Sequence, residues 1–78
     1  MSNNLDELFF RDIIKLVFLD SDVIAKENDI LKYIDTVRGL HSLCGGLIGT
    51  IIEFSLMVEE ELKSREKIEL LEEYENEY

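Results

Sequence analysis

The sequence contains no proline, no tryptophan, one histidine, one cysteine and only four glycines. Without proline the chain lacks the strongest breaker of helices, and its many leucines, isoleucines, glutamates and lysines favour helix. A single cysteine excludes an internal disulfide, and the opening residues lack the basic flank and apolar stretch of a secretory signal. We therefore expect a helical, cytoplasmic protein.

Basic residues are also scarce, because eight lysines and arginines stand against 18 acids, for a net charge of −10. Direct binding to nucleic acid or to an anionic membrane surface requires basic patches, so we expect neither. The charge favours a protein partner with a basic surface. Apolar residues make up 46% of the 78, enough for a single domain over residues 1–78, although so small a core gains from oligomerisation.

Catalytic chemistry is limited by the single histidine and the single cysteine. His41 and Cys44 are three residues apart, so they share a face if that segment is helical. They would suit half of a zinc site shared by two chains, or a nucleophilic pair, but no orienting acid or further ligand is placed nearby. Buried cysteine is commonly a small hydrophobe. We expect no enzymatic activity, no metal and no cofactor.

The first predicted helix spans roughly residues 5–19. Asn4 has a glutamate three residues later, which is a capping-box arrangement, and apolar residues then recur on one helical face. Residues 20–22 form a break after this helix and cap the start of the second predicted helix. We expect that helix to end at Gly39, because glycine favours the left-handed cap. Asn28 is a competing start that would separate the first turn from the rest.

Apolar residues in a heptad-like seam predict a third helix: Leu40, Leu43, Leu47, Ile51, Phe54, Val58 and Leu62. Beyond this seam the apolar residues lie on a different face. Either one long helix runs from about residue 43 to 76, which we favour, or the chain bends near 63–66 and a short fourth helix folds back. The fold class predicted is all-α, a small bundle of three helices, or four if the chain bends, with a long C-terminal helix.

Residues 43–54, LCGGLIGTIIEF, admit three interpretations. A nucleotide-binding loop is excluded, because the glycine spacing matches neither phosphate-binding motif and no lysine follows. A membrane span is disfavoured by Glu53, a charge near its middle. We favour a soluble helix in which small residues allow another helix to approach closely, within the chain or across a dimer: Gly45, Gly46 and Gly49. Alternatively, residues 39–46 form a turn and the helix starts at about Leu47.

A long third helix would extend beyond the first two. About 34 residues of helix span roughly 50 Å, whereas helices of 15–17 residues reach only about 25 Å. The apolar residues that would remain uncovered lie near the C-terminus: Ile68, Leu71, Tyr74 and Tyr78. A second copy of the chain is the simplest cover, so we expect a homodimer.

The C-terminal region, residues 59–78, holds nine acids and three bases. On a helix, five glutamates fall near one side: Glu59, Glu66, Glu69, Glu73 and Glu77. They form either a solvated face that only maintains solubility, or a row of carboxylates that imitates a nucleic-acid backbone. We expect a protein-binding modulator or inhibitor that docks these glutamates on a basic, nucleic-acid-binding partner. The alternatives are a homo-oligomeric assembly module in a larger complex and a small membrane-associated protein.

Overall fold

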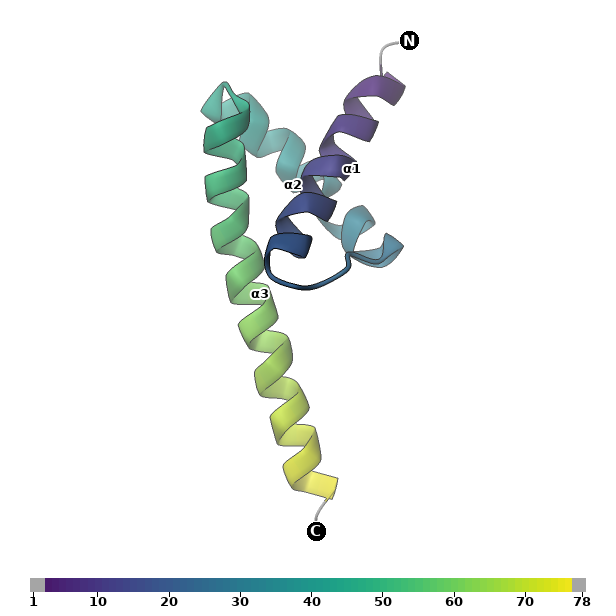
Figure 1. The fold of residues 1–78 in the computed structure, drawn as a ribbon, viewed down its shortest axis with the longest axis vertical. Coiled ribbons are helices and arrows are strands. Elements are labelled where there is room, and N and C mark those ends of the chain that lie inside the picture. The colour runs from purple at the N-terminus through teal and green to yellow at the C-terminus, as the bar shows by residue number, and fades with distance from the viewer. Residues whose placement is uncertain (1–2, 77–78) are drawn as a thin grey trace.

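The computed structural model describes the backbone of residues 3–76 and the side chains of residues 6–76. Three helices account for most of this part of the chain: α1 (Asn3–Asp20), α2 (Glu27–Cys44) and α3 (Leu47–Asn76). Helices α1 and α2 lie on the same side of α3 and pack against each other and against its N-terminal half (Figure 1). The small all-α bundle is therefore confirmed, and the long C-terminal helix is continuous through residues 63–66.

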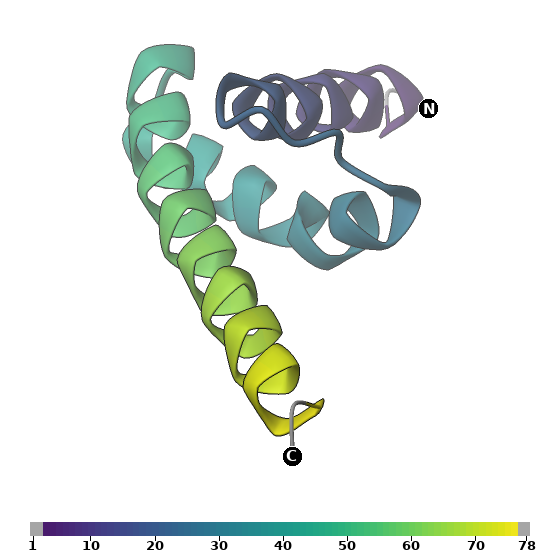
Figure 2. The ribbon, with the colours of Figure 1, turned by 60° about the horizontal axis from the view of Figure 1, so that its bottom comes forward.

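The core lies where the three helices meet. It is formed by ten buried side chains: Phe10, Ile13, Ile14, Val17, Phe18, Ile30, Tyr33, Val37, Phe54 and Val58. The ring of Tyr33 links the helices, because it lies 6.0 Å from the ring of Phe18 and 5.3 Å from that of Phe54. Figure 2 shows the consequence for the shape: α3 continues well beyond this core, and the molecule measures 55 × 23 × 18 Å.

Helix α1 ends as the sequence predicts, but α2 begins later than predicted. The N–H of Val23 donates to the carbonyl of Phe18, and Asp22 adopts a left-handed conformation with φ 61°, which closes the end of α1. The chain then runs extended to Lys26, and α2 starts at Glu27. Asp29 fixes this start, because its carboxylate accepts a hydrogen bond of 3.0 Å from the N–H of Lys26. The predicted start after Asp22 is wrong. The alternative, a later start that separates the first residues from the rest, is confirmed, although the cap is Lys26 and not Asn28.

Helix α2 also ends later than predicted, at Cys44 instead of Gly39. Leu40 packs against the core, and this contact outweighs the low helix propensity of Gly39. The left-handed cap is Gly45, with φ 67°, and its N–H donates to the carbonyl of His41 over 3.0 Å. The proposed turn over 39–46 is therefore limited to the last two residues of that range.

Helix α3 starts at Leu47, as predicted by the alternative in which a turn precedes the helix. Its inner face follows the predicted seam only from Ile51 to Leu62. The first part of the seam is wrong: Leu43, at the end of α2, is 86% exposed, and Leu47 is 44% exposed. Within residues 3–76 no helix is both long enough and apolar enough to cross a membrane. The predicted cap at Asn4 lies outside the described side chains.

Candidate acidic interaction surface

Four of the five predicted glutamates are exposed on α3, and we call them the acidic surface: Glu59, Glu66, Glu69 and Glu73. The fifth, Glu77, lies outside the described residues. Among residues 6–76, none of these four carboxylates makes an ion pair, whereas the neighbouring Glu60 and Glu61 do. The acidic surface therefore keeps its full negative charge toward solvent.

The spacing of the acidic surface follows from the helix. Steps of three and four residues place the carboxylates of Glu66, Glu69 and Glu73 about 4.5–6 Å apart along the axis, since each residue rises about 1.5 Å, whereas Glu59 lies seven residues, about 10.5 Å, before Glu66. A nucleic-acid strand carries one phosphate per about 3.4 Å. Glu73 lies on the distal part of α3, whereas Glu66 and Glu69 line a cleft that is shared with the connection after α1 and the first turn of α2. All four carboxylates are exposed, so they are open to a partner.

The guanidinium of Arg65 is turned toward the core side of α3. It donates to the carboxylate of Asp29 over 2.7 Å and to that of Glu61 over 3.1 Å. Lys32 reaches the same Glu61 carboxylate over 3.3 Å. These contacts join the first turn of α2 to the middle of α3, and they keep Arg65 engaged by two acids. It is therefore unavailable to neutralise the acidic surface.

The pKa values in this cluster follow its ion pairs. Burial alone would raise the pKa of Asp29, but the hydrogen bond from the Lys26 N–H and the contact with Arg65 together bring it below its ordinary value. The pKa of Glu61 is lowered by its hydrogen bonds with Lys32 and Arg65. The partners shift oppositely: Asp29 raises the pKa of Arg65, and Glu61 raises that of Lys32. Each group is thus held in its charged form at neutral pH.

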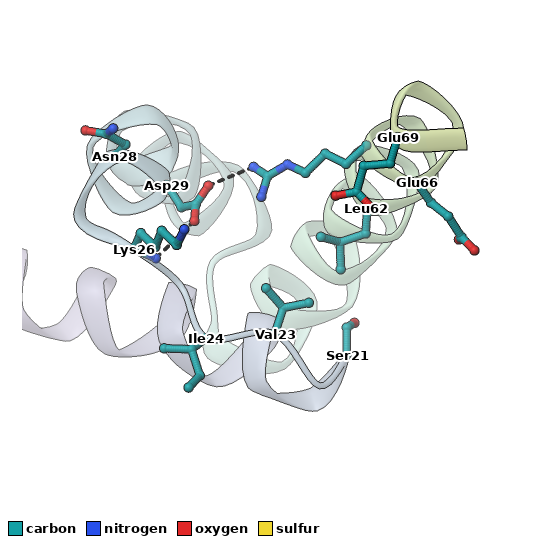
Figure 3. A pocket seen from close by; sticks show the side chains of 10 residues that line it. Ser21, Val23, Ile24, Lys26, Asn28, Asp29, Leu62, Glu66 and Glu69 are labelled. Atoms are coloured by element: carbon teal, nitrogen blue, oxygen red, sulfur yellow. Dashed lines mark hydrogen bonds and ion pairs between the residues drawn. The ribbon is translucent and has the colours of Figure 1, made fainter. Parts of the chain in front are cut away.

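A cleft of about 610 Å³ borders the acidic surface. It lies between the connection after α1, the first turn of α2 and the middle of α3 (Figure 3). Val23, Ile24 and Leu62 provide its apolar lining, and Glu66 and Glu69 stand on the α3 wall. The opposite wall carries Lys26, Asn28 and Asp29, and the dashed line in Figure 3 marks the ion pair that crosses to Asp29. The cleft therefore combines an apolar floor with carboxylates at its edge.

The three glycines predicted to permit close helix packing behave differently from one another. A Cβ atom on Gly45 or Gly46 would meet nothing within 4 Å, so neither contacts a second helix within this chain. Gly49 does lie against the end of α2, since an added Cβ would stand 3.1 Å from the Cβ of Cys44. Close packing inside the chain is thus found at Gly49 only. A role for these glycines between two copies stays a prediction.

The apolar residues predicted to remain uncovered are indeed exposed: Ile68 is 52% exposed, Leu71 55% and Tyr74 61%. They lie on the distal half of α3, beyond the reach of α1 and α2. The homodimer inferred from them stays a prediction.

The remaining candidates for chemistry are His41 and Cys44, near the end of α2. The ring of His41 lies 5.7 Å from that of Phe9 and 5.5 Å from that of Phe10, so it packs against the N-terminal half of α1. Cys44 is exposed at the end of α2. Within the described part of the chain, no three residues of types that bind metals are grouped so that they could hold an ion.

Reasoning from the sequence missed the Asp29–Arg65 ion pair. A capping signal was present, because an acid at the third helical position is typical of a helix start. Nothing in the sequence indicated that Arg65, 36 residues away, would reach it. No protein-family model, curated protein or solved structure matches this chain.

Proposed function

We propose that this protein is a non-enzymatic modulator or inhibitor that binds a basic surface of another protein through the acidic surface of α3. The observation that carries the proposal is the contrast along one helix. Glu60 and Glu61 are engaged by cations of the same chain, whereas Glu59, Glu66 and Glu69 are exposed and make no ion pair among the described residues. Unpaired, exposed carboxylates attract cationic groups of a partner.

The class of partner that fits best is a nucleic-acid-binding protein. Its basic groove is built to receive a row of phosphates and responds to the field as well as to the spacing of charges. A row of carboxylates about 4.5–6 Å apart presents a comparable field. The cleft beside Glu66 and Glu69 adds an apolar floor at Ile24, which is 81% exposed and suits the aliphatic part of an arginine or lysine side chain. The protein would then compete with nucleic acid for the partner.

The test is affinity capture from an extract of the source cells with three immobilised baits. The first is the unchanged protein. The second carries Glu66→Gln, Glu69→Gln and Glu73→Gln, which remove three charges from the acidic surface. The third, a matched control, removes three charges from exposed positions on α1 by changing Asp6→Asn, Glu7→Gln and Asp12→Asn.

We expect the first and third baits to retain the same protein and the second to lose it. Double-stranded DNA or RNA added to the captured complex should release the partner, since both compete for its basic groove. Equal retention by all three baits would refute the acidic surface as the binding site. A different result is that the second bait loses the partner but neither nucleic acid releases it from the first bait. That result would support the acidic surface as the binding site and refute the imitation of nucleic acid.

A second candidate is a helical assembly module, which is favoured by the exposed apolar side chains of Ile68, Leu71 and Tyr74 on the distal half of α3. Binding through these side chains would weaken with Ile68→Ser and Leu71→Ser and would tolerate the three glutamine substitutions. The same capture experiment separates the two candidates if a bait with both serine substitutions is added. A cytoplasmic location belongs to the leading proposal, because a chain with one cysteine does not depend on internal disulfides.

A further inference from the structure

A second stripe of exposed side chains runs along α3 on the side away from the core. Its members follow one another at steps of four, three, four, three and four residues, which is heptad spacing, and we call it the outer seam: Leu56, Glu60, Lys63, Lys67, Leu70 and Tyr74. Leu56 is 54% exposed, Leu70 is 60% exposed, and the other four are exposed as well. Heptad spacing on an exposed helix face is the pattern by which helices pair along their length.

The outer seam lies opposite the other helices. Each residue turns a helix by about 100°, so Leu56 lies roughly half a turn from Phe54, which is fully buried in the core. Helices α1 and α2 both lie on the side of Phe54, and no described part of the chain covers the other side (Figures 1 and 2). A helix of another molecule can therefore lie along the outer seam without displacing any element of the fold.

Five of the six residues of the outer seam, all but Tyr74, are arranged nearly symmetrically about residue 63. Leu56 and Leu70 stand seven positions to either side of it. Glu60 stands on its N-terminal side and Lys67 on its C-terminal side, at nearly equal distances. The seam thus has an acidic half and a basic half of matching extent, although the whole chain carries a net charge of −10. A stripe with these features is complementary to a reversed copy of itself.

We propose that the outer seam binds a second copy of this chain, with the two α3 helices antiparallel and the two-fold axis near Lys63. This register places Leu56 beside Leu70 of the second copy and Glu60 beside Lys67 of the second copy, and the symmetry makes each contact twice. A parallel pair would place Glu60 beside Glu60 and Lys67 beside Lys67, so the charges select the antiparallel orientation. Lys63 lies at the axis, where the Glu60 carboxylate of its own chain, 4.0 Å away, offsets its charge.

The charge pattern also selects the occupant. A basic partner is attracted to the acidic surface, whose carboxylates are unpaired, more strongly than to a seam that holds two lysines for one glutamate. Glu69 lies about 140° around α3 from Leu56 and stays exposed, whereas Glu66 and Glu73 directly precede the seam residues Lys67 and Tyr74 and flank the interface. The dimer rests on the seam residues and not on the function proposed above, and it covers the outer face of the distal half of each α3 with the proximal half of the other.

The first experiment measures dimer affinity by sedimentation and light scattering over protein concentrations up to about 0.1 mM. Each of Glu60→Lys and Lys67→Glu places like charges together, so we expect the dissociation constant to rise at least tenfold. The double variant restores opposite charges and should return it close to the original value. Glu72→Lys is the matched control, since it changes the net charge as Glu60→Lys does but lies roughly half a turn around α3 from Leu56, and it should not weaken the dimer.

The second experiment tests orientation by cross-linking single-cysteine variants in a Cys44→Ser background. A mixture of Leu56→Cys and Leu70→Cys should form a mixed disulfide dimer, whereas each variant alone should form little. Circular dichroism should show unchanged helix content in every variant used. A protein that stays monomeric up to about 0.1 mM, a charge reversal without effect, or efficient cross-linking of Leu56→Cys to itself would each overturn the antiparallel dimer.

Discussion

Replacing Asp29 with alanine should destabilise the fold more than any other removal of a single charge. Its carboxylate makes two contacts of different kinds: it accepts the Lys26 N–H over 3.0 Å, which starts α2, and it pairs with Arg65 over 2.7 Å, which ties α2 to α3. The residue is only 9% exposed, so water cannot replace these contacts in the folded state. Asp29→Ala removes both at once.

The size of the effect follows from the two contacts. Loss of a capping interaction costs about 1 kcal/mol. Loss of the ion pair with Arg65 costs about a further 0.5–1 kcal/mol. This cost is small for a carboxylate as buried as Asp29, because the Arg65 side chain is 37% exposed and still pairs with Glu61 over 3.1 Å in the variant. The total of about 1.5–2 kcal/mol is a large share of the roughly 4–12 kcal/mol expected for a domain of this size.

The assay is urea unfolding followed by circular dichroism at one fixed protein concentration, so that any self-association affects all samples alike. With a slope of about 1 kcal/mol per molar urea, the midpoint of Asp29→Ala should fall by about 1.5–2 M. Asp35→Ala is the matched control, because Asp35 also lies on α2 and pairs with Arg38 over 2.7 Å, but its side chain is 88% exposed. Its midpoint should move by less than about 0.5 M. Equal midpoints for the two variants would refute the assignment of Asp29.

Two further predictions concern glycine and pH. Gly39→Ala should stabilise the protein by about 0.5–1 kcal/mol, because the site is helical, exposed and open. Gly45→Ala should destabilise it, because φ is +67° there. The midpoints of thermal unfolding measure both effects, and equal effects would contradict the assignment of Gly45 as the cap. In urea unfolding, the original protein should be more stable than Asp29→Asn at pH 7, and this difference in stability should shrink below about pH 4. The reason is that the pKa of Asp29 is lowered in the folded state. The stabilisation is therefore present above the ordinary pKa and is lost as the pH falls through the lowered one. An advantage that does not change with pH would show that the charge of Asp29 is not what stabilises the fold.

The sequence predicts what depends on local pattern. The absence of proline and the apolar periodicity predict the three helices, and the steps from Ile51 to Leu62 identify the inner face of α3. The exposure of Ile68 and Leu71 follows from the length of α3 relative to the other two helices. These features depend on the helical repeat and on chain length, and both are visible without coordinates.

The helix boundaries were less predictable, because distant contacts decide them. Gly39 looks like a cap in sequence, but the core contact of Leu40 extends α2 by one more turn. Asp22 looks like the start of the next helix, but its left-handed backbone closes the preceding one. The candidate surface shows the same limit: its exposure followed from the pattern, but the engagement of Arg65 by Asp29 depends on how α2 lies across α3.

The central claim is that the carboxylates of α3 bind a basic partner, and the salt dependence of that binding tests it most directly. The dissociation constant of the captured partner should be measured between about 0.1 M and 1 M salt, a range over which the Debye length falls from about 10 Å to 3 Å. We predict a steep loss of affinity for the unchanged protein, and weak binding with a much smaller salt dependence for the variant with Glu66→Gln, Glu69→Gln and Glu73→Gln. Equal affinity and equal salt dependence for the two proteins would contradict the claim.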